Sequence, residues 1–315
     1  MDPSGESTAS VAMPVVSIHH RTTYRYRNAV AFGEHRMMFL PLQGFDQRVL
    51  SAEVEISPEP SLLRHIYDVS GAGVSIARFA ARSDGLTFET RVRLEHEPHP
   101  VLDLESDDAS VGPGLFHYAP PEAAELRGST APGQESTFVE AWARGFVRPL
   151  GRTRLSTVLT EMTHAIRSDF TYCLRLQGAP QSAEQTLTNR QGSCRDFAVL
   201  LIEAARSLGL AARFVSGYIY SASPKTRTGS GHTHAWARVY VPGCGWVDLD
   251  PTNGILGNTD LIRVVAVNDP GQALPLRGTW SGMPSDYLGM DVAVDVTVED
   301  AVTRSAATDR RAEAR

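Results

Sequence analysis

From residue 191 to residue 209 the chain reads Gln-Gly-Ser-Cys-Arg-Asp-Phe-Ala-Val-Leu-Leu-Ile-Glu-Ala-Ala-Arg-Ser-Leu-Gly, a loop followed by one strongly patterned helix. Apolar side chains recur every three or four residues and form a single stripe, at Phe197, Leu201, Ala204 and Leu208. Ser193 is a suitable N-cap, and Asp196 three residues later gives a capping-box-like start. Gly209 follows the last apolar position, where helices commonly stop in a left-handed conformation. We therefore predict a helix that begins just after Ser193 and stops at Gly209.

Cys194 falls in the first turn of this predicted helix. The helix dipole there favours a thiolate over a thiol, and the thiolate is the nucleophilic form of cysteine. Gly192 keeps the preceding loop thin, which leaves room for a substrate carbonyl to approach. A lone cysteine at a helix start is nevertheless more often a small buried side chain than a nucleophile. The case for chemistry at Cys194 therefore depends on partners elsewhere in the chain.

Two later segments offer such partners: His234-Ala-Trp-Ala-Arg-Val-Tyr-Val241 and Trp246-Val-Asp-Leu-Asp-Pro-Thr-Asn253. A thiol nucleophile needs an imidazole to take its proton, and the imidazole needs a third group to fix its tautomer and orientation. Both segments have the alternating pattern of strands. The chain thus offers Cys194, His234 and Asp250, in that order.

His234 and Asp250 can act together only if they project from the same face of the hairpin. Directly opposite residues of an antiparallel pair share a face, so the strands must be joined by an odd-length loop or carry a bulge. Gly243 and Gly245 make such a turn easy to form, whereas a regular two-residue hairpin would place the side chains on opposite faces. Taken singly, His234 is also explained as a structural histidine of the core, and Asp250 as the residue that opens a turn before proline.

Composition restricts the class of protein. With 315 residues, 42% hydrophobic and 21% charged, the chain has the composition of an ordinary globular protein of about two domains. A formal net charge of −6 argues against a nucleic-acid binder driven by bulk electrostatics. No signal peptide and no apolar membrane span is evident, so a cytoplasmic location without a membrane partner is the default expectation.

The sequence gives no reason to expect a metal or a cofactor. Its three cysteines are too few and too scattered for a disulfide framework or a four-ligand zinc site. His232-Thr-His234 resembles a fragment of a metal site but lacks the further ligands that one needs.

The pattern of the chain divides it into five parts. Residues 1–13 and 301–315 have the composition of disordered tails. Residues 14–108 contain short alternating strands bounded by Gly, Ser, Pro or Asp, which predict an antiparallel sandwich or barrel. Residues 109–135 are rich in Pro, Gly and Ser and are predicted to be a linker. Residues 136–300, with helices followed by strands, are predicted to form a catalytic core.

Four separated blocks resemble, in order, the core of the transglutaminase-like superfamily. They are Gly192-Ser-Cys-Arg-Asp-Phe-Ala198, Ala212-Arg-Phe-Val-Ser-Gly-Tyr218, His234-Ala-Trp-Ala-Arg-Val-Tyr240 and Gly245-Trp-Val-Asp-Leu-Asp-Pro-Thr252. The opening Ile18-His-His-Arg-Thr-Thr-Tyr-Arg-Tyr26 is similar to the β-rich region that precedes this core in bacterial members. The resemblance implies an α+β fold: a papain-like core behind a β-rich N-terminal region, with a Cys-His-Asp triad at Cys194, His234 and Asp250.

The resemblance also implies amide crosslinking, deamidation or hydrolysis of a peptide or amide. We expect acyl transfer from a peptide, protein or carboxamide substrate through a thioester, with hydrolysis favoured over crosslinking. Trp236, Gly192 and Tyr172 are expected to contact the substrate, although the tryptophan is also explained as a core aromatic. The alternative is a catalytically silent binding module that has kept the fold. The sequence leaves the substrate and the oligomeric state open.

Overall fold

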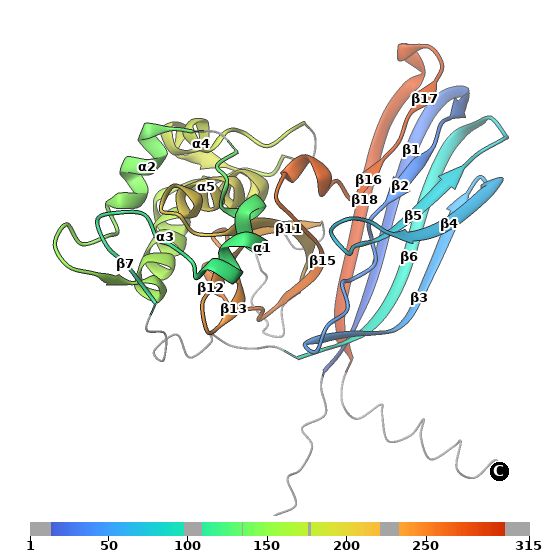
Figure 1. The fold of residues 1–315 in the computed structure, drawn as a ribbon. Helices are drawn as coiled ribbons and strands as arrows, with labels where there is room; N and C mark the ends of the chain where they lie inside the picture. The colour runs from blue at the N-terminus through green and yellow to red at the C-terminus, as the bar shows by residue number, and fades with distance from the viewer. Residues whose placement is uncertain (1–13, 98–108, 134, 176–177, 221–232, 300–315) are drawn as a thin grey trace, which may run out of the picture.

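The computed structural model describes residues 14–97, 109–133, 135–175, 178–220 and 233–299. The two predicted tails lie outside these residues. Figure 1 shows two regions side by side: a β-rich region built from both ends of the described chain, and a core of helices and strands built from its middle. The predicted α+β class, with a β-rich part before a transglutaminase-like core, is confirmed.

A five-stranded antiparallel sheet forms the centre of the core. Its order is β14 (Ile255–Leu256), β13 (Gly245–Asp250), β12 (His234–Val241), β11 (Ala212–Ile219) and β15 (Leu261–Val267). The helices of the core are α1 (Pro120–Thr130), α2 (Thr137–Arg144), α3 (Leu155–Asp169), α4 (Ala183–Asn189) and α5 (Cys194–Ser207). Two short pairs complete it: β7 (Ser110–Val111) with β8 (Thr153–Arg154), and β9 (Thr171–Tyr172) with β10 (Gln191–Gly192). None of the described helices is long and apolar enough to cross a membrane.

Helix α5 packs against the core sheet, on strands β11 and β12. The predicted apolar stripe is fully buried there, together with side chains of α3 and of the sheet. The helix begins at Cys194, and Gly209 after it has a φ of +87°. A side chain at Gly209 would also lie 2.4 Å from the carbonyl oxygen of Phe116. The predicted extent of this helix is therefore confirmed.

Two antiparallel sheets form the β-rich region. In the larger sheet β1 (Val15–Phe32) pairs with β6 (Ser83–His96), β18 (Tyr287–Glu299) and β17 (Trp280–Ser281), and β6 pairs with β3 (Gln47–Ser57). The smaller sheet has the order β16 (Leu276–Arg277), β2 (His35–Met37), β5 (Gly73–Arg78) and β4 (Leu62–Tyr67). Side chains of both sheets bury one another, among them Met37, Ala77, Leu86 and Phe88. This is the sandwich that the alternating pattern predicts.

Strand β18 changes the domain boundaries expected from the sequence. We expected residues 136–300 to belong to the core, but β18 pairs with β1 over most of the length of both strands. Val292, Val294 and Val296 pack inward, while Asp291 and Glu299 form ion pairs with arginines on β1 and β6. Such a strand, with one apolar and one charged face, suits a sheet that packs on the core with one face and contacts solvent with the other. The expected linker at 109–135 likewise contains helix α1.

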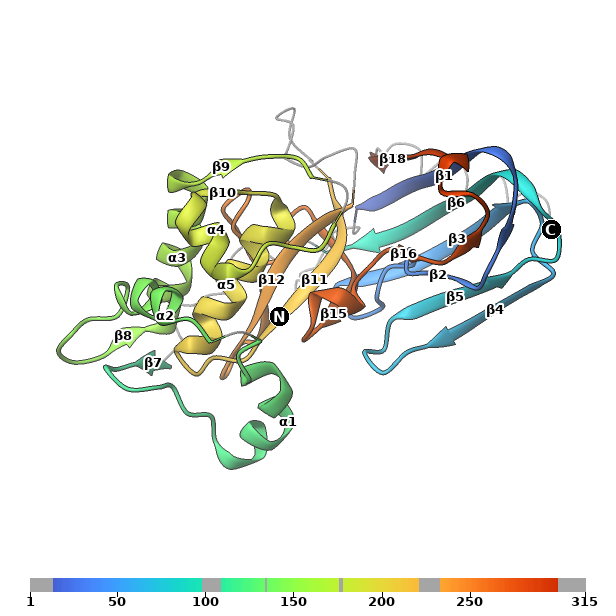
Figure 2. The ribbon, with the colours of Figure 1, turned by 90° about the horizontal axis from the view of Figure 1, so that it is seen from above.

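The larger sheet also packs directly on the core sheet. Its inner face contributes Val16, Ile18, Val92, Leu94 and Val294, and strands β11 and β15 with the residue after β11 contribute Tyr218, Tyr220, Ile262 and Val264. Seen from above in Figure 2, β11 and β15 lie on the side of the core that faces the β-rich region. Two buried histidines of the larger sheet, His20 and His96, bond the hydroxyl groups of Tyr218 and Tyr220 at 3.0 and 2.8 Å. The two regions therefore share one packed interface.

A buried arginine, Arg263 on β15, joins the two regions electrostatically. Its Nη2 donates to both carboxylate oxygens of Asp46 at 2.6 Å, and its Nη1 donates to Asp248 on β13 at 3.1 Å. Asn258 also donates to Asp46, at 2.8 Å. Burial alone would raise the pKa of Asp46, but the charge and hydrogen bond of Arg263 bring it below its usual value. The interface thus contains an ionised network rather than apolar contacts alone.

We predict that Asp46→Asn lowers the free energy of unfolding by about 2–3 kcal/mol, because it leaves part of a buried charge uncompensated. Urea unfolding followed by circular dichroism measures this loss. The control is Glu55→Gln, which removes one partner of an exposed ion pair with Arg91 and should cost less than about 1 kcal/mol. Equal effects of the two substitutions would contradict a special role for the buried network.

Candidate active site

A buried carboxylate fixes the start of helix α5 and so the position of Cys194. Asp196 accepts hydrogen bonds from the backbone N–H and the hydroxyl of Ser193 at 2.7 and 2.8 Å, and from the backbone N–H of Gln181 at 2.7 Å. Arg175 adds a charged donor. Burial raises the pKa of Asp196, but these donors outweigh it and lower the pKa. The predicted pairing of Ser193 with Asp196 at the helix start is confirmed.

A three-residue turn places His234 and Asp250 on the same face of the hairpin. Strands β12 and β13 pair out to Val241 opposite Gly245, so the turn consists of residues 242–244. Gly243 and Gly245 have φ values of +82° and +77°, which side chains rarely allow. The odd-length loop that the two residues require is therefore present. His234 Nε2 lies 2.9 Å from Asp250 Oδ2.

The carboxylate of Asp250 is held by two further donors. The backbone N–H of Thr252 donates to Oδ1 at 2.9 Å, and the side-chain amide of Asn253 donates to Oδ2 at 2.8 Å. Asp250 is completely buried, which raises its pKa, but the charge of His234 and these hydrogen bonds lower it overall. Sequence reasoning missed Asn253 as a positioning residue. The signal was its place in Asp-Pro-Thr-Asn, where a turn directs the amide back to the aspartate.

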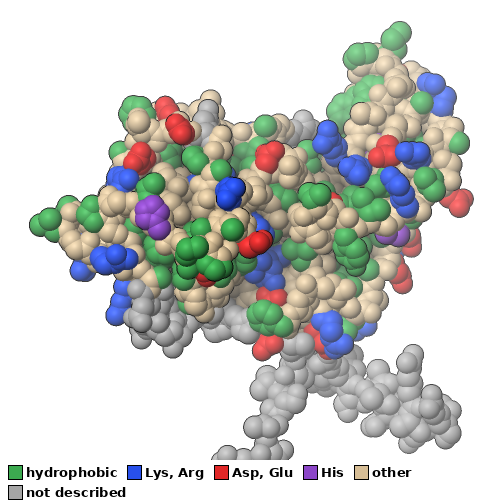
Figure 3. Space-filling view, viewed as in Figure 1, with side chains coloured by type: hydrophobic (Ala, Val, Ile, Leu, Met, Phe, Trp, Pro, Cys, Tyr) green, Lys and Arg blue, Asp and Glu red, His purple; other side chains and the backbone are tan. Residues whose placement is uncertain are grey.

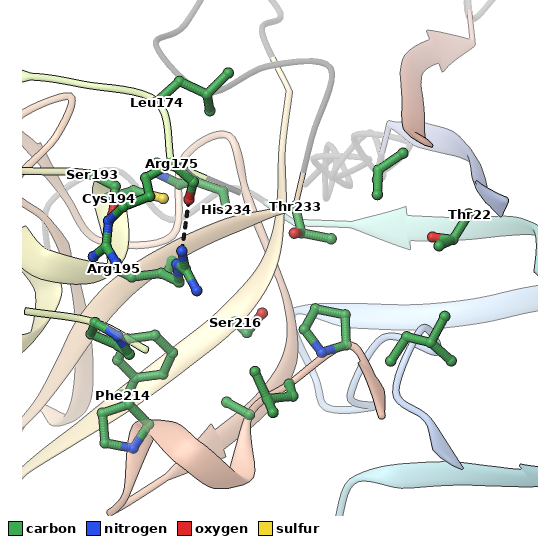
Figure 4. A pocket seen from close by; sticks show the side chains of 18 of the residues that line it. Thr22, Leu174, Arg175, Ser193, Cys194, Arg195, Phe214, Ser216, Thr233 and His234 are labelled. Carbon is green, nitrogen blue, oxygen red and sulfur yellow. Dashed lines mark hydrogen bonds between the residues drawn. The ribbon is translucent and has the colours of Figure 1, made fainter. Parts of the chain in front are cut away.

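The imidazole of His234 is held in its charged form. Burial lowers its pKa, but the charge and hydrogen bond of Asp250, followed by the influence of Cys194, raise the pKa to about 10. Because Nε2 faces Asp250, only Nδ1 is left to act on a second group. Nδ1 has no hydrogen-bond partner among the described residues. Figure 4 shows Cys194 and His234 at the same end of a pocket, so Nδ1 is the atom available to the thiol.

Trp236 does not lie where the sequence analysis placed it. We expected it to contact the substrate, but it is fully buried and is not among the residues that line the pocket. Its ring stacks on the imidazole of His234, with centroids 6.0 Å apart, and its Nε1 donates to Asp248 at 2.9 Å. Trp236 therefore packs behind the imidazole of His234. The alternative interpretation, a core aromatic, holds.

Gly192 also has a different role from the expected one. It is buried in β10 and does not line the pocket. A Cβ at this position would lie 2.8 Å from Cβ of Asp196 and 3.1 Å from the ring of Phe197. The glycine is thus needed because the first turn of α5 packs onto this strand, and not because a substrate approaches it.

Tyr172 does line the pocket, beside Cys194. It lies on β9, which pairs with β10 just before the cysteine. Burial, followed by the charges of Cys194, Cys173 and Asp250, raises the pKa of Tyr172. Its phenol therefore stays protonated at neutral pH and can donate a hydrogen bond. Of the three residues expected to contact substrate, Tyr172 alone has a position that fits.

The pocket encloses about 180 Å³ and lies between the core and the β-rich region. Figure 4 shows Cys194 and His234 on the core wall and Thr22 of β1 on the opposite wall. The β-rich region also contributes His20 of β1 and Met290 and Val292 of β18 to the lining. Sequence reasoning did not find this second wall, nor two arginines in the pocket, Arg175 and Arg195. The described residues contain no group of three or more His, Cys, Asp or Glu side chains that could hold a metal ion.

We predict that Gly192→Ala lowers the free energy of unfolding by about 1–3 kcal/mol, because the added methyl group overlaps the first turn of α5. Thermal or urea unfolding measures the change. Gly114→Ala is the matched control, since nothing lies within 4 Å of a Cβ there. The control should shift stability by less than about 1 kcal/mol. If the two variants unfold alike, the close packing at Gly192 does not constrain the helix start.

Comparisons with known proteins agree with this architecture. Residues 141–251 match the model of the transglutaminase-like superfamily, and residues 16–95 match the bacterial transglutaminase-like N-terminal region. Uncharacterized proteins of Mycobacterium bovis and Mycobacterium tuberculosis are 30% identical, over 91% of this chain and 96% of theirs. A solved structure from Cytophaga hutchinsonii, described as a candidate cysteine protease, has the same fold, with a TM-score of 0.69, 17% identity and 92% of each chain covered. The chain belongs to the transglutaminase-like superfamily and carries the N-terminal region of its bacterial members.

Proposed function

We propose that the protein is a cysteine-dependent enzyme that cleaves an amide bond of a peptide, protein or carboxamide through a thioester. The observation that carries this proposal is the arrangement of three side chains. Cys194 opens on a pocket, His234 lies at the same end of it, and Asp250 bonds the far nitrogen of the imidazole at 2.9 Å. A nucleophile, a proton carrier and a group that orients the carrier are the three parts of such a mechanism.

In the first half of the reaction, the thiolate of Cys194 attacks the amide carbonyl carbon. A tetrahedral intermediate forms, with a carbon–sulfur bond and a negative charge on oxygen. The imidazolium of His234 gives its proton to the leaving nitrogen, the carbon–nitrogen bond breaks, and the amine departs. The pKa of His234, raised to about 10, keeps this proton in place through neutral pH. Asp250 keeps the ring oriented throughout.

We propose two donors for the oxyanion. The backbone N–H of Cys194 belongs to the first residue of α5, and such groups have no acceptor within their own helix. Tyr172 lines the pocket together with Cys194, and its raised pKa keeps its hydroxyl protonated. We propose that it donates to the substrate carbonyl. Aimed donors of this kind are among the largest contributions to catalysis.

In the second half, neutral His234 takes a proton from water, and the hydroxyl attacks the thioester. The carbon–sulfur bond breaks, the acid leaves, and Cys194 returns to its starting state. A primary amine in place of water would give crosslinking. Transfer to an amine requires a docking site for a second substrate, whereas water requires none, so we propose hydrolysis as the main outcome.

The first test is the rate of Cys194 alkylation by iodoacetamide from pH 5 to pH 9, with Cys173 and Cys244 replaced by Ser. We predict fast labelling that persists near pH 6, because His234 stays protonated below about pH 10 and stabilises the thiolate beside it. His234→Ala should slow labelling at pH 6 by more than about tenfold. His164→Ala, a substitution of an exposed histidine on α3, should leave the rate unchanged.

Labelling that rises only near the ionisation of an ordinary thiol, at about pH 8.5, and equally in all three proteins, would reject the proposal. That result would favour the alternative, a binding module without catalysis.

The second test is Tyr172→Phe, which removes the hydroxyl and keeps the ring. We predict that turnover of a fluorogenic peptide library falls at least about tenfold, since one transition-state donor is lost. Alkylation of Cys194 should change less than about twofold, because alkylation forms no oxyanion. Tyr67→Phe, on the exposed strand β4, is the matched control. Unchanged turnover in Tyr172→Phe would remove Tyr172 from the mechanism.

A further inference from the structure

One face of the core sheet has two coverings, and the pocket beside Cys194 lies where they meet. Phe214 on β11 packs in the cluster that contains side chains of α5, whereas Tyr218, on the same side of the strand, packs on the larger sheet of the β-rich region. Ser216 lies between them and pairs with Ala235 on β12. Both Ser216 and Ala235 line the pocket. Because these two side chains are small, they leave a hollow between the helix and the larger sheet.

Apolar side chains form most of the remaining lining. They come from the segment after β9, from the segment after β15 and from the β-rich region: Leu174, Leu274, Pro275, Phe39, Met290 and Val292. These six side chains, together with Phe214, are the apolar lining of the pocket. Figure 3 shows hydrophobic side chains mixed with charged and polar ones over the visible face of the molecule, so this concentration is not typical of its surface.

The size of the pocket fits one side chain. Its volume is about 180 Å³. A cavity of about 150 Å³ lined by aliphatic and aromatic side chains stays free of water and binds benzene. The pocket beside Cys194 therefore has room for a group of about the size of a leucine or phenylalanine side chain.

The polar side chains that β1 contributes are hydrogen-bonded within the protein. Nδ1 of His20 lies 3.0 Å from the hydroxyl of Tyr218, and its Nε2 lies 3.1 Å from the hydroxyl of Thr22. Burial, followed by the charge of His19, lowers the pKa of His20 to about 4, so the ring is neutral at neutral pH. His20 and Thr22 therefore bring no charge to the pocket.

The two arginines that line the pocket also have partners within the protein. Arg175 forms an ion pair with the buried Asp196. Arg195 donates to two backbone carbonyl oxygens, one of them that of Arg175 at 2.6 Å, as drawn in Figure 4. Under the proposed mechanism Cys194 is an anion and His234 a cation, and both lie at the same end of the pocket. The apolar lining is thus the part of the pocket left to select a substrate.

We propose that the apolar lining is a subsite for one apolar side chain of the substrate, of about leucine or phenylalanine size, next to the amide that is attacked. This inference rests on the function proposed above and adds the substrate class. Burial of such a side chain removes apolar surface of both the substrate and the pocket from water. A polar side chain in the same place would lose its hydrogen bonds to water. The preferred substrate is therefore a peptide or carboxamide with a large apolar residue.

The test measures how fast neutral reagents with apolar groups alkylate Cys194 when Cys173 and Cys244 are replaced by Ser. The reagents are iodoacetamide and its N-isobutyl and N-benzyl derivatives. The rate with each derivative is divided by the rate with iodoacetamide, and this quotient is compared with that for glutathione, a thiol without a pocket. We predict quotients at least about tenfold above those of glutathione, because the apolar group becomes buried beside the thiol. Quotients within about twofold of those of glutathione would overturn the proposal.

Two variants of the apolar lining locate this effect in the pocket. Val292→Asp places a carboxylate there and should lower the N-benzyl quotient at least about fivefold, and Met290→Gln, which keeps the length of the side chain, should lower it at least about twofold. Val298→Asp is the matched control, because Val298 lies on the same strand, is exposed and does not line the pocket. Circular dichroism shows that each variant is folded. If folded variants of the lining keep the quotient of the control, the proposal is overturned.

A second experiment uses substrate-like amides in place of reactive groups. N-acetyl-leucinamide and N-acetyl-asparaginamide have side chains of nearly the same shape, one apolar and one polar. Each is tested for protection of Cys194 against iodoacetamide. We predict that half-protection needs at least about tenfold less of the leucine compound, since only its side chain gains from burial. Equal protection by the two amides, or protection by neither, would overturn the proposal.

The two proposals fail in different ways. The quotient compares neutral reagents on one thiol, so it does not depend on the fraction of Cys194 that is thiolate. Loss of the low-pH reactivity of Cys194 with the quotients intact would reject the enzyme and leave a binding pocket for an apolar side chain. If Cys194 is labelled rapidly near pH 6 but the quotients equal those of glutathione, the proposed function stands and the apolar subsite is rejected.

Discussion

The guanidinium of Arg263 connects the β-rich region to the side chains that surround His234. It binds Asp46 on one side and Asp248 on the other, and Asp248 also accepts from the indole of Trp236, which stacks on His234. Charges buried this deeply are tolerated only when each is paired and hydrogen-bonded. The two regions cannot separate without leaving these charges uncompensated. The β-rich region is therefore part of the structure that holds the site and not an appended module.

Two buried carboxylates organise the candidate site. Asp196 fixes the helix start that carries Cys194, and Asp250 fixes the imidazole of His234. Each is fully buried, and each accepts three or more hydrogen bonds. Such multiple donors keep a carboxylate ionised despite the loss of water around it. Cys194 and His234 are thus each positioned by a buried anion.

Local pattern sufficed to predict the parts of the site that depend on neighbours in sequence. The helix start at Cys194 follows from its cap and its apolar stripe. The shared face of His234 and Asp250 follows from the odd number of residues in the turn between their strands. Long-range pairing was not accessible in this way. The pattern of β18 predicts a strand but does not say that its partner is β1, more than 250 residues earlier.

Side-chain roles that depend on packing were likewise beyond the sequence. An aromatic residue two positions after His234 fits both a pocket wall and a core position. The complete burial of Trp236 shows that it occupies a core position. Gly192 fits a thin loop as well as a close contact with the next turn. Arg195 resembles any polar residue of a first helical turn, because only the tertiary structure shows that it lines the pocket.

The candidate triad and the opposite wall of the pocket come from different parts of the chain. Cys194, His234 and Asp250 are fixed within the core by hydrogen bonds to near neighbours. The opposite wall of the pocket comes from β1 and β18, which meet only because the two ends of the chain pair with each other. Under the proposed function, substitutions at Thr22 or Val292 would alter which substrate fits without moving Cys194. Changes at Arg263 would affect both parts, since this side chain ties the β-rich region, through Asp46, to Asp248 beside Trp236.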